Sequence, residues 1–515
     1  MITYSDNTKE FHYVPFNTDL TEWQYTSMAV VPKQPGKTVS TIRVLCAYEA
    51  NINTAYFDNI SLVREAAQTM TYDADGNLQS VASTGLQKDT STYSSGNLIK
   101  TITGGNGTFT YSYDATYPHR LKSVTNGIVT QSMLHDAVGN VTSTTLTGTG
   151  TTDKIVTSAT YGGNQNRLVS VTDATGATVS YNYDNANVQM LALPTRITDP
   201  SGTVTSYTYD SRNRVSQTGI ENWANLSYTY TKGNLTSVAR VAGGTTQTYS
   251  FAYDGFGNMT SAKVGSRTLS TYTYGANNGP LTKQTYGNGD TVAYTYDDLG
   301  RVKTSTTSDG KTVVYTYNGE GKLHSATTGN WRREFENDTL GRPFSSAEYK
   351  QEVVNGEQTW VEKLRLQNKY NDKNQLINQF RLLPDKTITT TYSYDNYGRL
   401  NSYNPGAGGS FVFSYDGLSR IASVSTHVHK RSYTYEDGAA ENTTTNRVSR
   451  YALTSAGAGQ YFVPLTYNYT YDEDGNILTI TDPISGNRSY TYDELGQMLT
   501  ETIAGTAHTH TAIII

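Results

Sequence analysis

The sequence has few cysteines, no long apolar run, no signal peptide at its start and no basic cluster. One cysteine, Cys46, occurs among 515 residues, so no internal disulfide and no cysteine-based zinc site can form. No run approaches the roughly 18 consecutive apolar residues of a membrane helix. The start MITYSDNTKEF also lacks the basic and apolar regions of a signal peptide. Basic clusters are missing and the net charge is −5, which argues against a nucleic-acid partner.

Hydrophobic residues are also scarce, at 36%, a value that by itself is typical of disorder. Charged residues make up only 17%, however, and the chain has 42 Tyr among many Thr and Val. These residue types favour strands, and 45 Gly against 12 Pro supply many tight turns. The composition therefore predicts a folded all-β protein with many hairpins.

One short phrase recurs from near residue 70 almost to the end of the sequence. It reads YTYDELGQML at 490–499, YTYDDLGRV at 294–302 and FAYDGFGNM at 251–259, and most copies follow the previous one after 20 to 26 residues. Degenerate copies such as HDAVGN at His135 and NDTLGR at Asn337 keep the spacing, and two longer gaps predict inserted loops or extended hairpins at about 345–366 and 437–465. The residues that we predict to have a structural role in these copies are Tyr72, Asp73, Gly76, Tyr113, Asp114, Tyr183, Asp184, Tyr209, Asp210, Tyr253, Asp254, Gly257, Tyr296, Asp297, Gly300, Tyr394, Asp395, Gly398, Tyr415, Asp416, Tyr471, Asp472, Gly475, Tyr492, Asp493 and Gly496.

The copy around residue 296 shows what the phrase predicts locally. Tyr294 and Tyr296 share one face of a strand, Asp297 can accept backbone N–H bonds in a turn, and Gly300 can adopt a positive φ. The returning strand runs to a second turn at 308–311, so one repeat is two strands and two turns. Tyrosines repeated in every hairpin are expected to stack across neighbouring strands.

The number of repeats constrains the whole sheet. Nineteen hairpins, or nearly 40 strands, would extend on the order of 180 Å if the sheet were flat. Twisted sheets seldom exceed about ten strands without curling or splitting into two packed sheets. The turns between the strands are too short to connect separate sheets, so splitting is excluded. The sequence therefore predicts a long antiparallel sheet that spirals around a lumen.

The iterated phrase Tyr-Asp-x-x-Gly-Asn/Arg resembles the YD repeat of Rhs proteins, bacterial wall-associated proteins, Tc-toxin cocoon subunits and teneurins, over residues 65–507. The resemblance implies a hollow β-shell in a secreted or cell-surface protein, with a C-terminal toxin or other passenger as its partner. In many toxin-bearing members a self-cleaving Asp-Pro-x-Gly-Leu core follows the repeats. The stretches 199–202 (DPSG) and 482–486 (DPISG) lack that Leu, and we interpret them as turns. Residues 508–515 are expected to be a truncated end.

The first 64 residues carry no copy of the phrase. The stretch AYFDNISL at 55–62 resembles the last strand of carbohydrate-binding jelly-roll sandwiches. We therefore expect residues 1–64 to be the C-terminal part of such a β-sandwich, since 64 residues cannot complete one.

Candidate catalytic and metal-binding residues are few. The loops at Asp73 and Asp472 alternate acidic residues, but Thr84 and Pro483 occupy the place where a calcium loop requires a bidentate Glu. The pairs 427/429 and 508/510 are histidines two positions apart without a marked third ligand, and Glu334 with Glu336 are better interpreted as a charged strand face than as glycosidase carboxylates. We predict no catalytic residue, no metal and no cofactor.

Three functions are compatible with these observations. The first is a non-catalytic shell that contains or presents a passenger. The alternative is a cell-surface adhesin or carbohydrate-binding module that recognises glycans through the sandwich of residues 1–64 or through exposed loops at 345–366 and 437–465. A polysaccharide-cleaving surface enzyme is the third and least supported.

Overall fold

The computed structural model describes residues 1–13, 30, 32–34, 36–44, 68–83, 85–94, 96–163, 166–184, 193–221, 223–457 and 463–509. Strands are the regular secondary structure of this part of the chain, and no helix occurs in it. The chain divides into two compact units. One unit is Met1–Glu65 with Tyr317–Lys322, and the other is Ala66–Thr316 with Leu323–Ile515.

The first unit contains a small antiparallel sheet of three strands. Its strands are β1 (Ile2–Tyr4), β2 (Lys9–Glu10) and β3 (Val39–Ile42), in the order β2-β1-β3. Ile2 and Tyr4 are fully buried, and the Tyr4 hydroxyl donates a hydrogen bond to the Glu10 carboxylate. Cys46 and the jelly-roll signature at 55–62 lie outside the described residues, so the assignment of residues 1–64 to a sandwich stays a prediction.

Of the 42 strands that the described ranges contain, the other 39 belong to one long sheet. They are β4 (Gln68–Tyr72), β5 (Leu78–Ser83), β6 (Asp89–Tyr93), β7 (Ile99–Gly104), β8 (Gly107–Tyr113), β9 (Leu121–Thr125), β10 (Val129–His135), β11 (Val141–Gly148), β12 (Lys154–Gly162), β13 (Arg167–Thr172), β14 (Thr178–Asn182), β15 (Arg196–Thr198), β16 (Val204–Tyr209), β17 (Val215–Ile220), β18 (Ala224–Thr231), β19 (Asn234–Ala242), β20 (Thr245–Tyr253), β21 (Met259–Val264), β22 (Arg267–Tyr274), β23 (Leu281–Tyr286), β24 (Thr291–Tyr296), β25 (Val302–Thr307), β26 (Thr312–Tyr317), β27 (Leu323–Thr328), β28 (Trp331–Asn337), β29 (Pro343–Val354), β30 (Glu357–Tyr370), β31 (Leu376–Leu382), β32 (Thr387–Tyr394), β33 (Leu400–Asn404), β34 (Phe411–Tyr415), β35 (Ile421–Ser425), β36 (His429–Asp437), β37 (Thr444–Ser455), β38 (Leu465–Tyr471), β39 (Ile477–Thr481), β40 (Arg488–Tyr492), β41 (Met498–Ile503) and β42 (Thr506–Thr509).

Strands of this sheet pair antiparallel with the strands next to them in the chain, as β24–β25 and β25–β26 do. The Tyr-Asp phrase lies at the turn between an even-numbered strand and the next odd-numbered one, from β4–β5 to β40–β41. We call these the Tyr-Asp turns and the turns at the opposite strand ends the connecting turns. The predicted all-β antiparallel sheet is confirmed. The longer gaps are extended hairpins, β29–β30 and β36–β37.

A β-bulge recurs beside the tyrosine of the phrase. In β24–β25, Thr295 is opposite Thr304, but Tyr296 is opposite Val302, so Lys303 is an extra residue on the returning strand. The same register shift occurs at other copies, including those in β4–β5, β20–β21, β34–β35 and β40–β41. Bulges bend a strand and increase its twist. Because the bulge falls at the same sheet edge in successive hairpins, the bends add up to a steady curvature.

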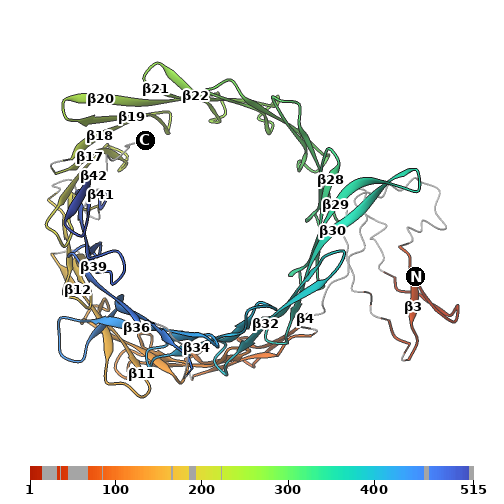
Figure 1. Ribbon diagram of the computed structural model, residues 1–515, viewed down its shortest axis with the longest axis horizontal. Helices are drawn as coiled ribbons and strands as arrows, with labels where there is room; N and C mark the ends of the chain where they lie inside the picture. The colour runs from red at the N-terminus through yellow and green to blue at the C-terminus, as the bar shows by residue number, and fades with distance from the viewer. Residues whose placement is uncertain are drawn as a thin grey trace. The chain divides into compact units, whose positions relative to one another are not determined.

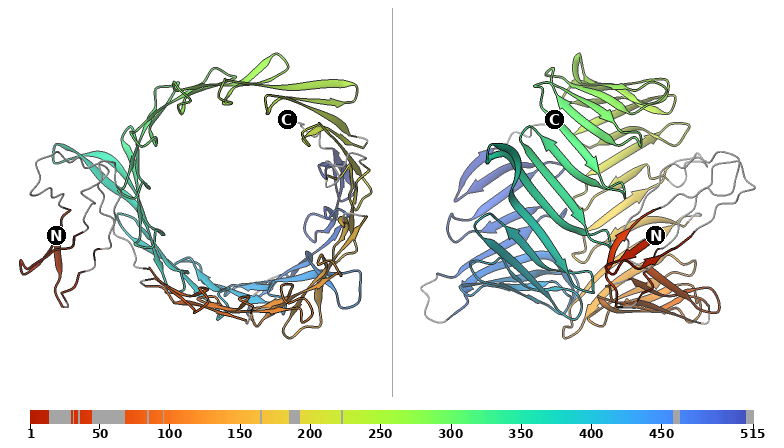
Figure 2. Two further views of the ribbon diagram at one scale, coloured as in Figure 1. Left: turned by 180° about the vertical axis from the view of Figure 1, so that it is seen from behind. Right: turned by 90° about the vertical axis from the view of Figure 1, so that its right-hand side faces the viewer.

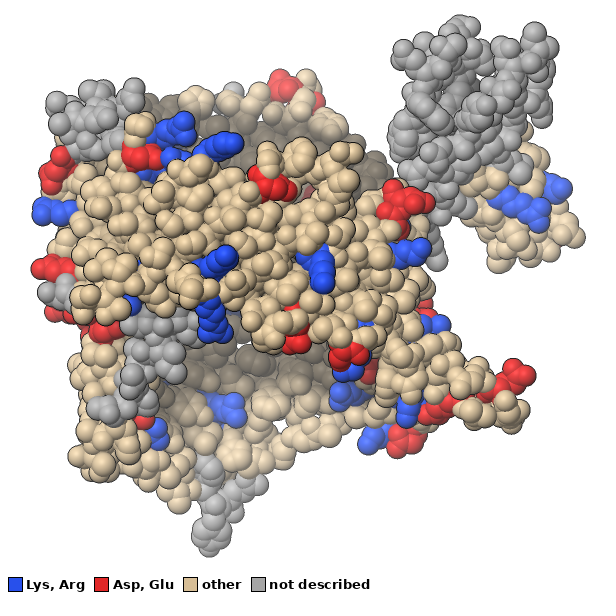
Figure 3. All heavy atoms as spheres, turned by 90° about the horizontal axis from the view of Figure 1, so that it is seen from above, with Lys and Arg blue, Asp and Glu red and all other residues tan. Residues whose placement is uncertain are grey.

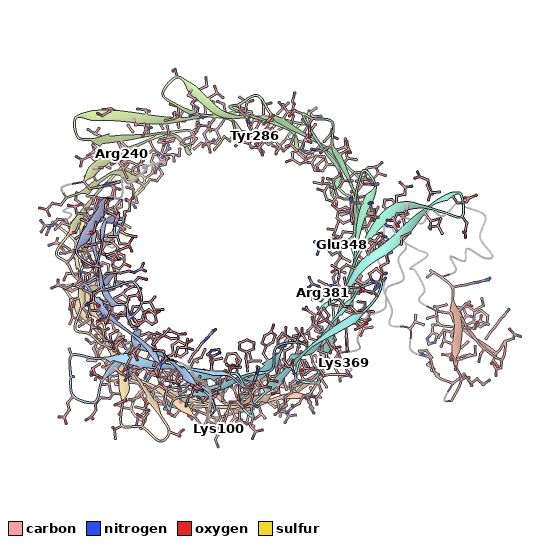
Figure 4. All side chains as sticks on the ribbon, in the orientation of Figure 1. Lys100, Arg240, Tyr286, Glu348, Lys369 and Arg381 are labelled. Carbon is pink, nitrogen blue, oxygen red and sulfur yellow. The ribbon has the colours of Figure 1, made fainter. Side chains whose placement is uncertain are left out.

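The curvature winds the second unit into a ring of more than one turn (Figure 1). Late strands such as β34 and β36 overlie early ones such as β11 in this view, and the side view of Figure 2 shows the two windings displaced along the ring axis. The side chains drawn in Figure 4 occupy both faces of the wall and leave the centre of the ring clear. The unit is therefore a hollow, single-layered β-shell, as the strand count predicted.

A single-layered wall exposes both of its faces. The accessible surface of the chain is 32114 Å², whereas a compact protein of this mass would expose about 18,500 Å². The wall is held partly by pairs of hydroxyl groups, such as Thr295 with Thr304 at 2.6 Å and Ser414 with Ser423 at 2.7 Å. These cross-strand pairs explain how a sheet with so few apolar residues is stable. On the face drawn in Figure 3, charges of both signs are scattered among uncharged residues.

Candidate functional site

Each Tyr-Asp turn is organised around the carboxylate of its aspartate. In the copy at residue 297, the backbone N–H groups of Leu299 and Arg301 donate to Asp297 Oδ1 at 3.0 and 2.9 Å. The Arg301 guanidinium donates to Oδ2 from Nε at 2.8 Å, and its Nη2 lies 2.7 Å from the same oxygen. An asparagine replaces the arginine in other copies, where its amide donates to the same carboxylate oxygen, as at Asn77 and Asn258. The turn therefore explains why Asn or Arg follows the glycine.

The glycine of the phrase adopts the left-handed conformation that the sequence predicted. Gly300 has a φ of 75°, and its N–H donates to the carbonyl oxygen of Asp297 at 2.9 Å. Copies without glycine place another residue in this region, such as Asn213 at 60° and Ser419 at 68°. Asparagine is one of the few residues that tolerates a positive φ, so the degenerate copies keep the same turn.

The tyrosine of the phrase ties its turn to the preceding one. The Tyr296 hydroxyl donates to the carbonyl oxygen of Leu281, which begins the returning strand of the previous copy, at 2.5 Å. The same bond joins further pairs, namely Tyr93–Leu78, Tyr113–Ile99, Tyr183–Leu168, Tyr209–Pro194, Tyr230–Val215, Tyr253–Leu235, Tyr274–Met259, Tyr370–Pro343, Tyr394–Leu376, Tyr415–Leu400, Tyr435–Ile421, Tyr471–Val448 and Tyr492–Ile477. The hydroxyl of Tyr72, in the first copy, contacts Met70 Sδ at 3.6 Å instead.

The arginine of a turn also contacts the tyrosine of the following copy. Arg214 lies over the ring of Tyr230, with 4.0 Å between the guanidinium carbon and the ring centroid, and Arg399 lies over Tyr415 at 4.3 Å. The sequence analysis did not predict this cation–π contact, although the sequence shows the Arg of one phrase and the Tyr of the next. Rings of neighbouring strands contact one another in the row Tyr392–Tyr403–Phe411, but they are tilted by 37° and 34° rather than stacked, and the row involves the tyrosine two positions before the phrase's own.

In the copy at residue 297, the contacts of the turn lower the pKa of the aspartate and raise the pKa of the tyrosine. The hydrogen bond from the Arg301 side chain is the main cause that lowers the pKa of Asp297. The Asn77 and Asn258 amides likewise lower the pKa of Asp73 and Asp254. Burial raises the pKa of Tyr296, so its hydroxyl keeps its proton. These shifts stabilise a charged aspartate and a neutral tyrosine, which is the arrangement that the hydrogen bonds require.

The Tyr-Asp turns of the second winding contact the connecting turns of the first. Gln87 N–H donates to the carbonyl oxygen of Asp372 at 2.6 Å, although 285 positions separate the two residues. Further hydrogen bonds of this kind join Lys154 N to Asn442 O at 3.0 Å, Ala439 N to Ala174 O at 2.9 Å, and Ser201 N to Asp474 Oδ1 at 3.2 Å. Lys154 and Thr443 also form a parallel bridge. The edge that carries the repeated phrase is thus a contact surface between windings.

Glycines allow the backbones to approach closely at this contact. A Cβ on Gly148 would lie 1.9 Å from the carbonyl oxygen of Gly417, and a Cβ on Gly417 would lie 2.7 Å from that of Thr149. Leu418, in the same Tyr-Asp turn, is only 4% exposed, and Ile128, in a connecting turn of the first winding, is 8% exposed. Two of the few buried apolar side chains of the shell therefore belong to turns at the edges where the windings meet.

The other candidate residues take up structural positions. Asp199 Oδ1 accepts the Thr203 N–H at 2.7 Å, and Asp482 Oδ1 accepts the Ile484 N–H at 2.9 Å, so both Asp-Pro stretches form turns. Glu334 pairs with Arg332 at 3.0 Å. The described part of the chain holds no group of three or more His, Cys, Asp or Glu side chains placed to bind a metal. Position 510, the partner of His508, lies outside that part.

Comparison with known families agrees with the repeated phrase. The family model described as RHS Repeat matches residues 193–220, 277–312, 296–330 and 471–508, which fall on copies of the phrase. These stretches of the chain therefore carry RHS repeats, the repeat that the phrase resembles. No curated protein matches the sequence.

Several solved structures are similar to the chain at low identity. The crystal structure of TcdB2-TccC3-Cdc42 is 14% identical, with a TM-score of 0.49, over 84% of this chain and 25% of that one. The Tc holotoxin pore of Photorhabdus luminescens is 12% identical, with a TM-score of 0.44, over 85% and 25%. The chain thus spans about a quarter of the length of these structures. A porin-like protein from Bacteroides uniformis is 12% identical, with a TM-score of 0.12, over 55% and 92%.

Proposed function

We propose that residues 65–507 are the non-catalytic shell segment of a secreted or cell-surface Rhs/wall-associated-type protein, and that this shell contains or presents a C-terminal, toxin-like passenger. The open centre enclosed by a wall of RHS repeats carries this proposal. Successive strands of the wall are paired, and its windings are joined through their turns. Such a wall separates a passenger from solvent and leaves few strand edges free to associate.

The geometry of the repeats supports a structural role for the phrase. The carboxylates of the turns are occupied by backbone N–H groups of the same turn and by the Asn or Arg side chain. The tyrosine hydroxyls are occupied by carbonyl groups of the previous copy. We therefore assign the predicted Tyr, Asp and Gly residues to the architecture of the shell, without catalysis. No helix of the described residues has the length and apolar character needed to cross a bilayer.

Protease protection tests the container directly. An unstructured reporter peptide fused after residue 515 is expected to be cleaved more slowly than the same peptide fused before Met1, because the shell shields it. A Gly148→Val variant forces the two windings apart at Gly417 and is expected to remove the difference. Equal cleavage rates for both reporters on the unaltered chain would contradict the proposal.

The alternative of a glycan-binding module rests on residues 1–64 or on the segments 345–366 and 437–465. Its signature at 55–62 lies outside the described residues, so glycan binding stays a prediction of the sequence. Binding of the whole chain to an array of cell-surface glycans would support it.

A further inference from the structure

The contact between windings uses two different surfaces. One is an edge of Tyr-Asp turns, contributed by the second winding, and the other is an edge of connecting turns, contributed by the first. The two surfaces fit together through backbone hydrogen bonds, close glycine approaches and the covering of Leu418. Within one chain, therefore, an edge of Tyr-Asp turns already binds an edge of connecting turns.

The same two kinds of edge recur where no winding covers them. The Tyr-Asp turns of the first winding, which we call the leading rim, expose their apolar side chains. Val138 is 70%, Phe256 67% and Leu299 66% exposed, whereas the side chains at the corresponding place in covered turns of the second winding are less exposed, Tyr397 at 41% and Leu418 at 4%. A Cβ on Gly300 would meet no atom within 4 Å. The leading rim thus presents the surface that elsewhere in this chain is buried against connecting turns.

The opposite edge is open in the same way. The connecting turns from about residue 243 onward, which we call the trailing rim, contain glycines whose Cβ would meet nothing within 4 Å, including Gly243, Gly265 and Gly310. In the covered part of this edge, a Cβ on Gly105 would lie 2.9 Å from Lys373 Cα and a Cβ on Gly148 would lie 1.9 Å from Gly417 O, although Gly85 and Gly107 there also have open space. Ile484, in a connecting turn of the second winding, is 68% exposed.

We propose that the leading rim of one copy binds the trailing rim of a second copy of this chain, repeating the contact that already joins the two windings. The two rims belong to the same chain and carry the two complementary kinds of turn, and the proposed interface continues one that the fold itself uses. Such a head-to-tail contact is heterologous, so each dimer keeps one free rim of each kind and grows into an open stack. The proposal does not depend on the identity of any passenger.

Sedimentation of the whole chain with paired rim variants tests the proposal. The leading-rim variant carries Val138→Asp, Phe256→Asp and Leu299→Asp, and the trailing-rim variant carries Ser266→Glu and Ile484→Glu. The control is Val314→Asp, which adds a charge at a 42% exposed valine within strand β26. Circular dichroism is used to check that the variants keep the strand content of the unaltered protein.

The unaltered chain and the control are expected to show a weight-average mass that rises with concentration to more than twice the monomer. Each rim variant alone is expected to stay monomeric, and an equimolar mixture of the two is expected to form dimers, because one intact rim of each kind remains. A monomeric unaltered chain at about 100 µM, rim variants that associate as strongly as the unaltered chain, or a mixture without dimers would each overturn the proposal. Association of the trailing-rim variant alone would indicate contact between like rims instead.

Discussion

At each Tyr-Asp turn, the residues of the phrase have different structural roles. The aspartate holds the turn closed, the glycine supplies the left-handed backbone, and the tyrosine joins the turn to the previous one, as Asp297, Gly300 and Tyr296 show. In that copy, the carboxylate and the hydroxyl are both engaged in hydrogen bonds within the sheet. The phrase is repeated because each hairpin needs its own closed turn and its own link to a neighbour.

Gly300→Val is expected to destabilise its hairpin by roughly 1–3 kcal/mol, because a β-branched residue resists a φ of 75°. No atom lies within 4 Å of the added Cβ, so the cost is confined to the backbone. Gly255→Val is the matched control, because Gly255 lies in another Tyr-Asp turn with equally open space and without a positive φ. Amide hydrogen exchange at both hairpins measures the effect, and equal losses for the two variants would contradict the turn geometry.

Tyr296→Phe is expected to weaken the link between neighbouring turns by about 1 kcal/mol, because the half-buried carbonyl of Leu281 loses its donor. Tyr72→Phe is the control, since the Tyr72 hydroxyl contacts a sulfur and its side chain is exposed. Hydrogen exchange in β23 and β24 should accelerate for the first variant alone. An unchanged exchange rate there would show that the hydroxyl bond adds nothing to stability.

Asp297 should make its own hairpin sensitive to acid. Arg301 lowers the pKa of Asp297 below its ordinary value of 3.8 in the folded protein. The ionised carboxylate therefore contributes its full stabilisation above pH 3.8, and this contribution is lost as the pH falls through the lowered folded value. Asp297→Asn is expected to reduce stability at pH 7 and to flatten the local loss between about pH 5 and pH 2. Local hydrogen exchange across that range is the measurement, and an unchanged acid response would contradict it.

At the scale of the hairpin, the sequence predicted the two strands and the two kinds of turn, and it placed an inserted loop or an extended hairpin at each longer gap, where the structure has the hairpins β29–β30 and β36–β37. These follow from local patterns, namely period-2 alternation and turn chemistry. The bulge at Lys303 was not predicted, because whether a residue is paired or extra depends on the register of the partner strand. The stacking of Arg214 on Tyr230 was missed for a similar reason, since it joins two copies that only the folded sheet brings together.

The contact between windings gives a prediction at the same scale. Gly148→Ala is expected to displace the turn at Gly417, because the new Cβ would lie 1.9 Å from a backbone oxygen that has no rotamer to change. Hydrogen exchange at Thr149–Lys154 and at 416–419 should accelerate, while the strand content by circular dichroism stays the same. Gly457→Ala, at a glycine with open space and no positive φ, is the control. Unchanged exchange in both segments would contradict the contact.

At the scale of the whole shell, the sequence predicted a sheet that curves around a lumen, since nearly 40 strands cannot stay flat. It did not predict which turns meet. That depends on how many strands complete one winding, and this number is the sum of many small twists and bulges. Gln87 and Asp372 therefore become neighbours through the accumulated curvature of the strands between them, and no local signal marks either residue.

Small-angle X-ray scattering of the monomeric chain tests the central claim most directly. A solid globule of 515 residues would have a radius of gyration of about 24 Å. A single-layered wall around an open centre places its mass away from the middle, so the account predicts a clearly larger radius and a pair-distance distribution whose maximum is shifted to longer distances. Rim variants that stay monomeric allow the measurement without association. A radius near 24 Å with the symmetric distribution of a filled sphere would contradict the hollow shell.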